Sequence, residues 1–283
     1  MNNSTTTLAQ VTRILDGFYP PSTAQSWDAV GLVTGDPAQA IERVLFAVDP
    51  ALDVIDEAVN GGYDLLVTHH PLLMRGVKSV ATTSGKGRAV TALVVGDVAL
   101  YAAHTNADVA TPGVNDALAV ACGLRGVEPL VETEGQPLGR VGDLESPMTL
   151  RAFCERLASK LPPAPVGLRV SGDPDAEVAR VAVLGGAGDG EFGAARAAGA
   201  DVYVTADLRH HPAIESREED AAEKPLFLVD AGHWASEWLW LEHASERLRD
   251  AVAAEGADLE VAVSRRRTDP WDFLVSTSEG EQQ

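Results

Sequence analysis

Short apolar runs rich in β-branched residues alternate with amphipathic stretches along most of the chain. The apolar runs are typical of buried strands, and the amphipathic stretches are typical of helices that cover a sheet. The predicted strands are, in chain order, 43–49, 63–70, 98–104, 178–186, 201–206, 225–231 and 259–264. The predicted helices are 51–62, 86–96, 113–123, 148–161, 189–199, 212–222 and 234–254. This βαβ rhythm predicts an α/β fold with largely parallel sheets, whose functional groups gather beyond the carboxyl ends of the strands.

The rhythm loosens once, in the middle of the chain, where Gly, Pro and acidic residues surround a single predicted helix. We therefore expect four parts: an N-terminal α/β half at 1–125, a connecting segment with one helix at 126–177, a C-terminal α/β half at 178–275 and a disordered tail at 276–283. The two halves share their order of elements, although no residue-level repeat relates them.

Composition restricts the partners and the compartment. The chain of 283 residues has a formal net charge of −20, and a negative surface repels phosphate backbones, so nucleic acid is not expected as a partner. The basic triplet Arg265, Arg266 and Arg267 is interpreted as solvated side chains at a strand end. Cys122 and Cys154 both fall in predicted helices, which argues against a disulfide framework and fits a reducing cytoplasm. No leader-like start and no apolar run of the ~18 residues that cross a bilayer occur, so no membrane or targeting segment is expected.

The histidines occupy a restricted set of places. In the stretch DLLVTHHPLL, two adjacent histidines follow a predicted strand directly. Of the seven histidines, six lie at or just after a predicted strand end, namely His69, His70, His104, His210, His211 and His233. Because parallel strands present their carboxyl ends at one edge of a sheet, we expect these side chains to converge on one cleft.

Imidazoles and carboxylates are the ligands that hold Zn, Fe or Mn, whereas the thiolates that favour a structural zinc are absent from every cluster. His69 and His70 cannot point the same way in a regular strand, so they can face two metal ions, or one metal ion and a substrate, as the chain turns at Pro71. A turn with surface histidines is the alternative. Asp108 is a candidate ligand, and His104, four residues earlier, is a ligand, a proton shuttle or an orienting group.

The motif GHWASE places His233 and Glu237 four residues apart at the start of a predicted helix, directly after a strand. An imidazole and a carboxylate at this spacing lie on one face of the helix, whereas an ordinary helix N-terminus explains only the carboxylate. The candidate metal ligands are therefore His69, His70, Asp108, His233 and Glu237. Five groups are too many for one catalytic zinc, so two divalent metal ions that share Glu237 or Asp108 fit better.

Two further motifs follow predicted strands. In ADLRHHP, Asp207 and His211 can orient a substrate or transfer protons. In GGAGDGE, backbone amides can cradle an anion such as phosphate, although a tight connection between strand and helix explains the glycines equally well. The glycines concerned are Gly185, Gly186 and Gly188.

Taken together, these residues resemble the dinuclear-metal family of GTP cyclohydrolase I type 2 homologues, over about residues 8 to 275. The motifs that carry the resemblance are, in order, SWDAVGLVTGD, VTHHPLL, AHTNADVATPGVNDALA, GGAGDGEF, VTADLRHH and DAGHWASE. Ala29, Pro112 and Ala206 depart from the usual pattern, and none of them is a candidate ligand. The resemblance implies two similar α/β halves with mainly parallel or mixed sheets packed together, a metal cleft between them and a toroidal homohexamer.

The resemblance also implies that the five ligands above bind the metals, and that His104, Asp207 and His211 line the same pocket as catalytic groups. The implied activity is metal-dependent hydrolysis of a nucleotide or another small phosphorylated heterocycle, with a metal-activated water and with the three glycines as a phosphate cradle. A metal-dependent phosphoesterase and a non-catalytic metal-binding or adaptor protein remain open as alternatives. An exchangeable coordination position separates the catalytic functions from the non-catalytic one.

Overall fold

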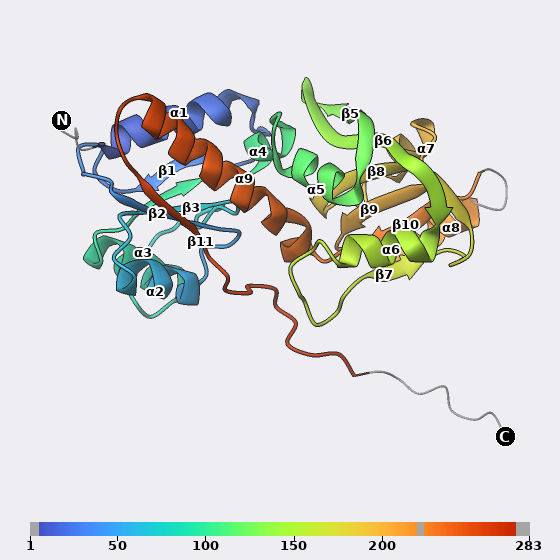
Figure 1. The fold of residues 1–283 in the computed structure, drawn as a ribbon. Coiled ribbons are helices and arrows are strands. Elements are labelled where there is room, and N and C mark those ends of the chain that lie inside the picture. The colour runs from blue at the N-terminus through green and yellow to red at the C-terminus, as the bar shows by residue number, and fades with distance from the viewer. Residues whose placement is uncertain (1–5, 220–223, 276–283) are drawn as a thin grey trace.

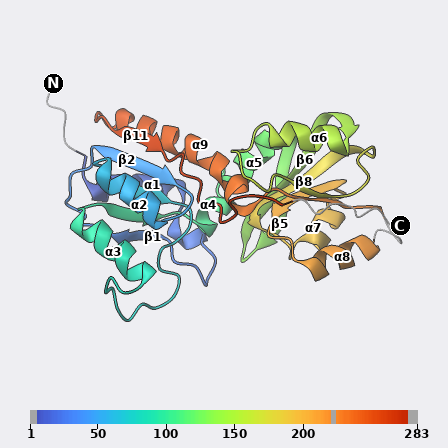
Figure 2. The same ribbon diagram turned by 90° about the horizontal axis from the view of Figure 1, so that it is seen from below.

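The computed structural model describes residues 6–219 and 224–275, so the tail expected at 276–283 lies outside the described residues. The chain forms two α/β halves, one around a five-stranded sheet and the other around a six-stranded sheet, which lie next to each other (Figures 1 and 2). The predicted fold class, two α/β halves built on mixed sheets, is confirmed. Within the described part of the chain, no helix combines the length and apolarity needed to cross a membrane.

The first sheet has the strand order β1-β4-β3-β2-β11, with β1 antiparallel at one edge and the other strands parallel. Alternate side chains face opposite sides of the sheet: Val44 and Phe46 pack with α1 and α9, whereas Leu45 packs with α2 and α3. The elements are β1 Gly31–Thr34, β2 Arg43–Ala47, β3 Leu65–Thr68, β4 Ala99–Ala102, β11 Glu260–Val263, α1 Leu8–Phe18, the 3₁₀ turn Pro21–Thr23, α2 Leu52–Asn60, α3 Gly85–Val95 and α9 His233–Ala254.

The second sheet has the order β5-β6-β8-β9-β10-β7, in which β8, β9 and β10 are parallel. Val181 and Val183 face α5 and α6, and Ala182 faces the side covered by α7 and α8. The elements are β5 Leu124–Thr133, β6 Gln136–Thr149, β7 Arg169–Ser171, β8 Glu177–Ala187, β9 Val202–Ala206, β10 Phe227–Asp230, α4 Thr105–Val109, α5 Val114–Cys122, α6 Leu150–Ala158, α7 Phe192–Ala197 and α8 His210–Glu219.

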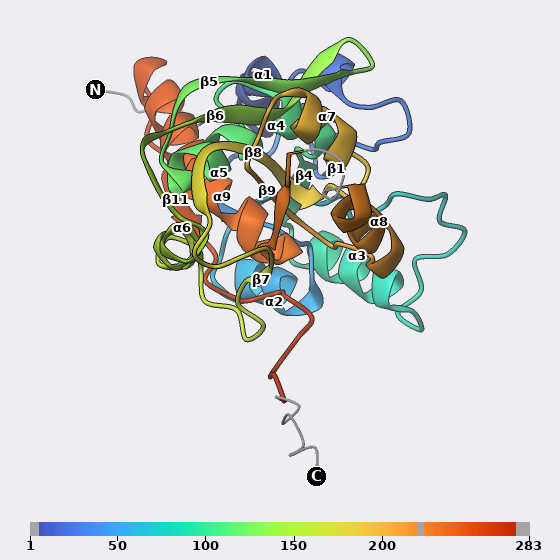
Figure 3. The same cartoon turned by 90° about the vertical axis from the view of Figure 1, so that its right-hand side faces the viewer.

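Helix α9 joins the two α/β halves. It begins beyond the end of β10 in the second sheet and leads into β11, which pairs with β2 in the first sheet. A helix of 22 residues is about 33 Å long, so it carries the chain from one half to the other. Figure 3, which looks from the side of the second sheet, shows the two halves one behind the other. The last strand of the expected C-terminal half therefore belongs to the sheet of the N-terminal half.

The range 126–177, expected as a connecting segment with one helix, also supplies most of β5, the whole of β6 and β7. The strands β5 and β6 pair as an antiparallel hairpin, and most side chains of β5 are exposed or half-buried, so the usual alternation of apolar and polar residues is missing there. Without that alternation, the sequence pattern could not reveal the hairpin. The helix expected at 148–161 is present as α6.

Candidate metal centre

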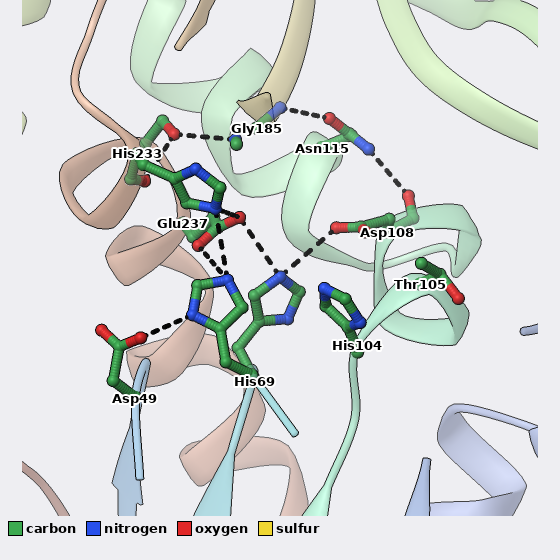
Figure 4. Close-up of polar contacts among 12 residues, drawn as sticks. Asp49, His69, His104, Thr105, Asp108, Asn115, Gly185, His233 and Glu237 are labelled. Carbon is green, nitrogen blue, oxygen red and sulfur yellow. Dashed lines mark hydrogen bonds and ion pairs between the residues drawn. The ribbon is translucent and has the colours of Figure 1, made fainter. Parts of the chain in front are cut away.

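The candidate metal centre lies where strand ends of the first sheet meet the first turn of α9 (Figure 4). His69 and His70 directly follow β3, and Asp108 lies in the short helix α4 after β4. His233 and Glu237 belong to the start of α9. Because β3 and β4 are parallel neighbours, their carboxyl ends lie at the same edge. Helix α9, which follows β10 of the second sheet, adds His233 and Glu237 to this edge.

Glu237 is the centre of this cluster. Its Oε1 atom lies 3.0 Å from His233 Nε2 and 3.4 Å from His69 Nε2, and its Oε2 atom lies 3.1 Å from His70 Nε2. The Nε2 atoms of His70 and His233 are 3.2 Å apart, and His69 Nε2 lies 3.7 Å from Asp108 Oδ1. The fold thus brings together all five side chains proposed as ligands, and it gives the two oxygens of Glu237 different imidazole neighbours.

Each imidazole of the cluster has an acceptor at its Nδ1 atom, which orients the ring. The Nδ1 to acceptor distances are 2.9 Å for His69 to Ala103 O, 2.7 Å for His70 to Asp49 Oδ1, 2.9 Å for His104 to Asp28 Oδ1 and 2.8 Å for His233 to Asp207 Oδ2. A carbonyl or carboxylate oxygen only accepts, so Nδ1 carries the proton and a neutral ring keeps its lone pair on Nε2. The lone pairs of His69, His70 and His233 then meet around Glu237, and metal-binding histidines are commonly held by an acceptor at the other ring nitrogen in this way.

Three buried acceptor atoms of the cluster have no hydrogen-bond partner among the described residues: His69 Nε2, Asp108 Oδ1 and Glu237 Oε2. Buried polar atoms are almost always paired, so three unpaired acceptors at one point indicate a site for a cation. Burial and the nearby negative charge of Glu237 raise the pKa of Asp108 to about 7. The donor set of imidazole nitrogens and carboxylate oxygens fits Zn, Fe or Mn.

The electrostatics of the cluster also favour a positive charge. Burial lowers the pKa of His70, but the charge of Glu237 and the hydrogen bond to Asp49 outweigh it and raise the pKa to about 10. Burial likewise lowers the pKa of His233, yet its hydrogen bonds to Asp207 and Glu237 raise the pKa to about 11. A positive charge is therefore favoured at this point of the cluster, either as protons on these rings or as a metal ion that displaces them.

Asp28 and Asp49 orient two of the histidines, and the sequence analysis does not single them out. A signal for each is present, since Asp49 ends the strand predicted at 43–49 and Asp28 lies in the motif SWDAVGLVTGD. Burial raises the pKa of Asp28, but hydrogen bonds from His104 and Thr105 outweigh it and hold the pKa below its usual range. Sequence spacing alone does not reveal such contacts, because the partners are 21 and 76 residues apart.

Three further sets of residues were predicted to take part in the site, as catalytic groups or as a phosphate cradle. Asp207, proposed as a catalytic group, accepts from His233 Nδ1 and so orients a candidate ligand. His211 has an exposed side chain near the start of α8, and no contact with the cluster is seen for it in the described residues. The glycines proposed as a phosphate cradle are Gly185, Gly186 and Gly188, whose amides already donate to Asn115 Oδ1, Ser236 Oγ and Ala206 O. These N–H groups are therefore not presented to an anion.

Gly186 has a different role, because it allows a close approach. Its φ is +69°, and a Cβ atom there would overlap Oε1 of Glu237 and lie 3.2 Å from His233 Nε2. Only glycine combines this backbone conformation with the space that the cluster needs.

A cavity of about 390 Å³ opens beside the cluster, which is within the range of small-molecule sites. His70 and His233 border it together with their partners Asp49 and Asp207. Arg169 of β7 and the segment 268–271, which follows β11, form other parts of its wall. A small molecule in this cavity would therefore lie next to two of the candidate ligands.

Comparison with known proteins places this arrangement in a family. The model of Duf34/NIF3 (NGG1p interacting factor 3) matches residues 6–270. The chain belongs to the DUF34/NIF3 family. A relative from Streptomyces coelicolor, named GTP cyclohydrolase 1 type 2 homolog, is 50% identical over 276 residues, which is 96% of this chain and 95% of the relative.

Two solved structures share the fold of this DUF34/NIF3 chain. A Bacillus cereus protein related to NIF3 superposes with a TM-score of 0.87 at 26% identity and covers 96% of this chain and 100% of its own. A hypothetical protein from Staphylococcus aureus has the same TM-score at 30% identity, with coverage of 96% and 100%. The family and the fold expected from the six motifs are thus confirmed.

Proposed function

We propose that this DUF34/NIF3 protein is a hydrolase that holds two divalent metal ions and acts on a nucleotide or another small phosphorylated heterocycle. The observation that carries the proposal is the meeting of five imidazoles and carboxylates in one cluster. Three of these side chains have a buried acceptor atom that makes no hydrogen bond among the described residues. The names of the curated relatives, GTP cyclohydrolase 1 type 2 homolog, support the substrate class.

In this proposal His69, His70, Asp108, His233 and Glu237 would hold the metals, with Glu237 at the centre of the set. Divalent ions bound there supply Lewis acidity and an activated water. The carboxylates of Asp49 and Asp207 fix two of the rings as neutral ligands through Nδ1. His104, whose Nδ1 is held by Asp28, is the candidate for proton transfer because its ring lies 5.2 Å from that of His69 and outside the Glu237 contacts.

The activity is tested on protein purified without chelator. Metal content is measured first, and formate release from GTP is then compared with phosphate release from a panel of phosphodiesters. Formate release supports the cyclohydrolase-type reaction, and phosphate release alone supports a phosphoesterase. Bound metal without any turnover supports a non-catalytic metal-binding or adaptor protein.

Metal binding at pH 7 is expected to release protons. His70 and His233 carry protons at this pH because their pKa values are raised to about 10 and about 11, and a coordinating imidazole must be neutral. Raising the pH from 6 to 8 therefore strengthens binding, by up to roughly tenfold per pH unit for each proton released. Calorimetry of Zn²⁺ binding in buffers of different ionisation enthalpy measures the release. A heat that does not depend on the buffer would contradict the prediction.

Gly186→Ala is expected to weaken metal binding by roughly 10- to 100-fold, because the added methyl group displaces the Glu237 carboxylate. The positive φ adds roughly 1–2 kcal/mol of destabilisation. Gly190→Ala is the matched control, since a Cβ at Gly190 meets no atom within 4 Å. Metal titrations and urea denaturation of both variants measure the effects, and equal metal affinities would argue against Glu237 as a metal ligand.

We also propose a cytoplasmic location, in line with the cysteine usage, and a homohexamer, in line with the resemblance described above. Light scattering coupled to size-exclusion chromatography measures the assembly directly. A monomer or a dimer at micromolar concentration would count against the hexamer and would leave the metal site untouched, because all five proposed ligands come from one chain.

A further inference from the structure

The segment that follows β11 closes one side of the cavity beside the metal centre. After Val263 the chain passes near the start of α9 and forms neither helix nor strand through residue 275 (Figures 1 and 3). Thr268, Asp269, Pro270 and Trp271 of this segment line the cavity together with His70 and His233. The proposed ligands His70 and His233 therefore form one side of the cavity, and residues 268–271 form another.

Side-chain contacts fix this segment to the metal centre. The Thr268 hydroxyl donates to the carboxylate of Asp49, whose other oxygen accepts from His70 Nδ1. Next to Thr268, Asp269 is 8% exposed, and its Oδ1 accepts from the backbone N–H of Trp271 at 2.9 Å. The backbone of Trp271 is thus held by Asp269. The neighbouring Thr268 is held by Asp49, which also contacts the proposed ligand His70.

Trp271 offers an aromatic surface at this cavity. Its side chain is 63% exposed although its backbone is held on both sides, by Asp269 and by the Arg267 guanidinium, which donates to its carbonyl oxygen. An exposed indole on a held backbone is a platform for a planar ring, and such stacking between a base and an aromatic side chain tolerates any base. Trp234, which also lines the cavity, is nearly buried and packs against Trp238.

Arg169 is the cation of the cavity wall. It pairs with Asp230 through one N–H, and its side chain is 62% exposed. A guanidinium has five N–H donors and binds phosphate or carboxylate groups well, so further donors are left for a ligand. Four carboxylates also line the cavity, and each accepts a hydrogen bond, which reduces its repulsion of an anion. Asp49 and Asp207 accept from His70 and His233, Asp230 accepts from Arg169, and Asp269 accepts from the backbone of Trp271.

We propose that this cavity is the substrate subsite and binds a planar heterocycle that stacks on Trp271 while its anionic substituent contacts Arg169. The inference rests on the proposed function and deepens it, because it assigns a separate contact to each part of the substrate: Trp271 to the ring and Arg169 to the anionic substituent. A free phosphate or a sugar phosphate satisfies Arg169 alone, and an uncharged nucleoside satisfies Trp271 alone.

Calorimetric titration of the metal-loaded protein with three probes separates the contacts: GMP, guanosine and ribose 5-phosphate. Trp271→Ala is expected to weaken GMP and guanosine by roughly 5- to 150-fold and to leave ribose 5-phosphate unchanged. Trp271→Phe restores most of the affinity, because a phenyl ring also stacks. Arg169→Gln weakens GMP and ribose 5-phosphate but not guanosine. Phe273→Ala is the matched control, since Phe273 is 76% exposed in the same segment and does not line the cavity.

The outcomes separate this inference from the proposed function. Unchanged GMP binding in Trp271→Ala overturns the subsite, as does a wild-type protein that binds neither GMP nor guanosine. If wild-type protein releases formate or phosphate while Trp271→Ala leaves KM unchanged, the subsite fails and the hydrolase stands. If GMP binds through Trp271 and no substrate is turned over, the hydrolase fails and the subsite stands. Metal content measured on every variant confirms that the metal centre is intact.

Discussion

Glu237→Gln is expected to lower metal affinity more than roughly 100-fold, beyond the 10- to 100-fold loss typical of residues that only orient a ligand. The side chain is 4% exposed, and its two oxygens lie 3.0 to 3.4 Å from the Nε2 atoms of His69, His70 and His233. Glutamine keeps the shape but removes the charge and one of the two acceptor oxygens with which Glu237 would hold a cation. Hydrolysis is expected to fall to background.

Metal content by elemental analysis and affinity by competition with a chromophoric chelator measure the loss. Glu242→Gln on the same helix is the matched control, because its side chain is 53% exposed and pairs with Arg265 away from the cluster. Circular dichroism shows whether the variant is folded. A folded Glu237→Gln protein that holds metal with wild-type affinity would refute the role of Glu237 as a metal ligand.

Trp240→Ala is expected to lower the free energy of unfolding by roughly 3–5 kcal/mol, as large aromatic truncations in a core do. Trp240 is fully buried, its Nε1 donates to Tyr19 Oη at 3.0 Å, and its ring packs against Phe46. The ring centroid of His69 lies 5.7 Å away, so the cavity left by the truncation also borders the metal centre. Metal affinity is therefore expected to fall together with stability.

Urea denaturation with metal removed measures the stability effect, and the same titration as above measures the metal affinity. Trp271→Ala serves as the control for stability, since an exposed side chain changes the free energy of unfolding by less than about 0.5 kcal/mol. Trp240→Phe fills part of the space and should lose less than the alanine variant. A loss below 1 kcal/mol in Trp240→Ala would mean that this core repacks around the gap.

Much of the fold was predictable because a buried parallel strand appears in the sequence as a short continuous run of apolar residues. The runs at 43–49 and 201–206 became β2 and β9, and both are buried almost throughout. The hairpin of β5 and β6 gave no such pattern, because most of β5 and the last part of β6 are exposed or half-buried, whereas the middle of β6 packs into the core with Leu138 and Val141. The helix α1 was readable, with a capping box at Thr7 and a buried apolar stripe, but the sequence analysis did not assign it.

The sequence by itself indicated which residues could bind metal, because imidazoles and carboxylates directly after buried parallel strands lie near the edge where those strands end. Only the tertiary structure decided how each ring is held, since the acceptors at Nδ1 come from loops and strands far away in the chain. It also decided that the amides of Gly185 and Gly186 are occupied and that β11 joins the first sheet. Hydrogen-bond partners and strand neighbours depend on how elements pack in three dimensions, and local patterns of apolar residues carry no record of that packing.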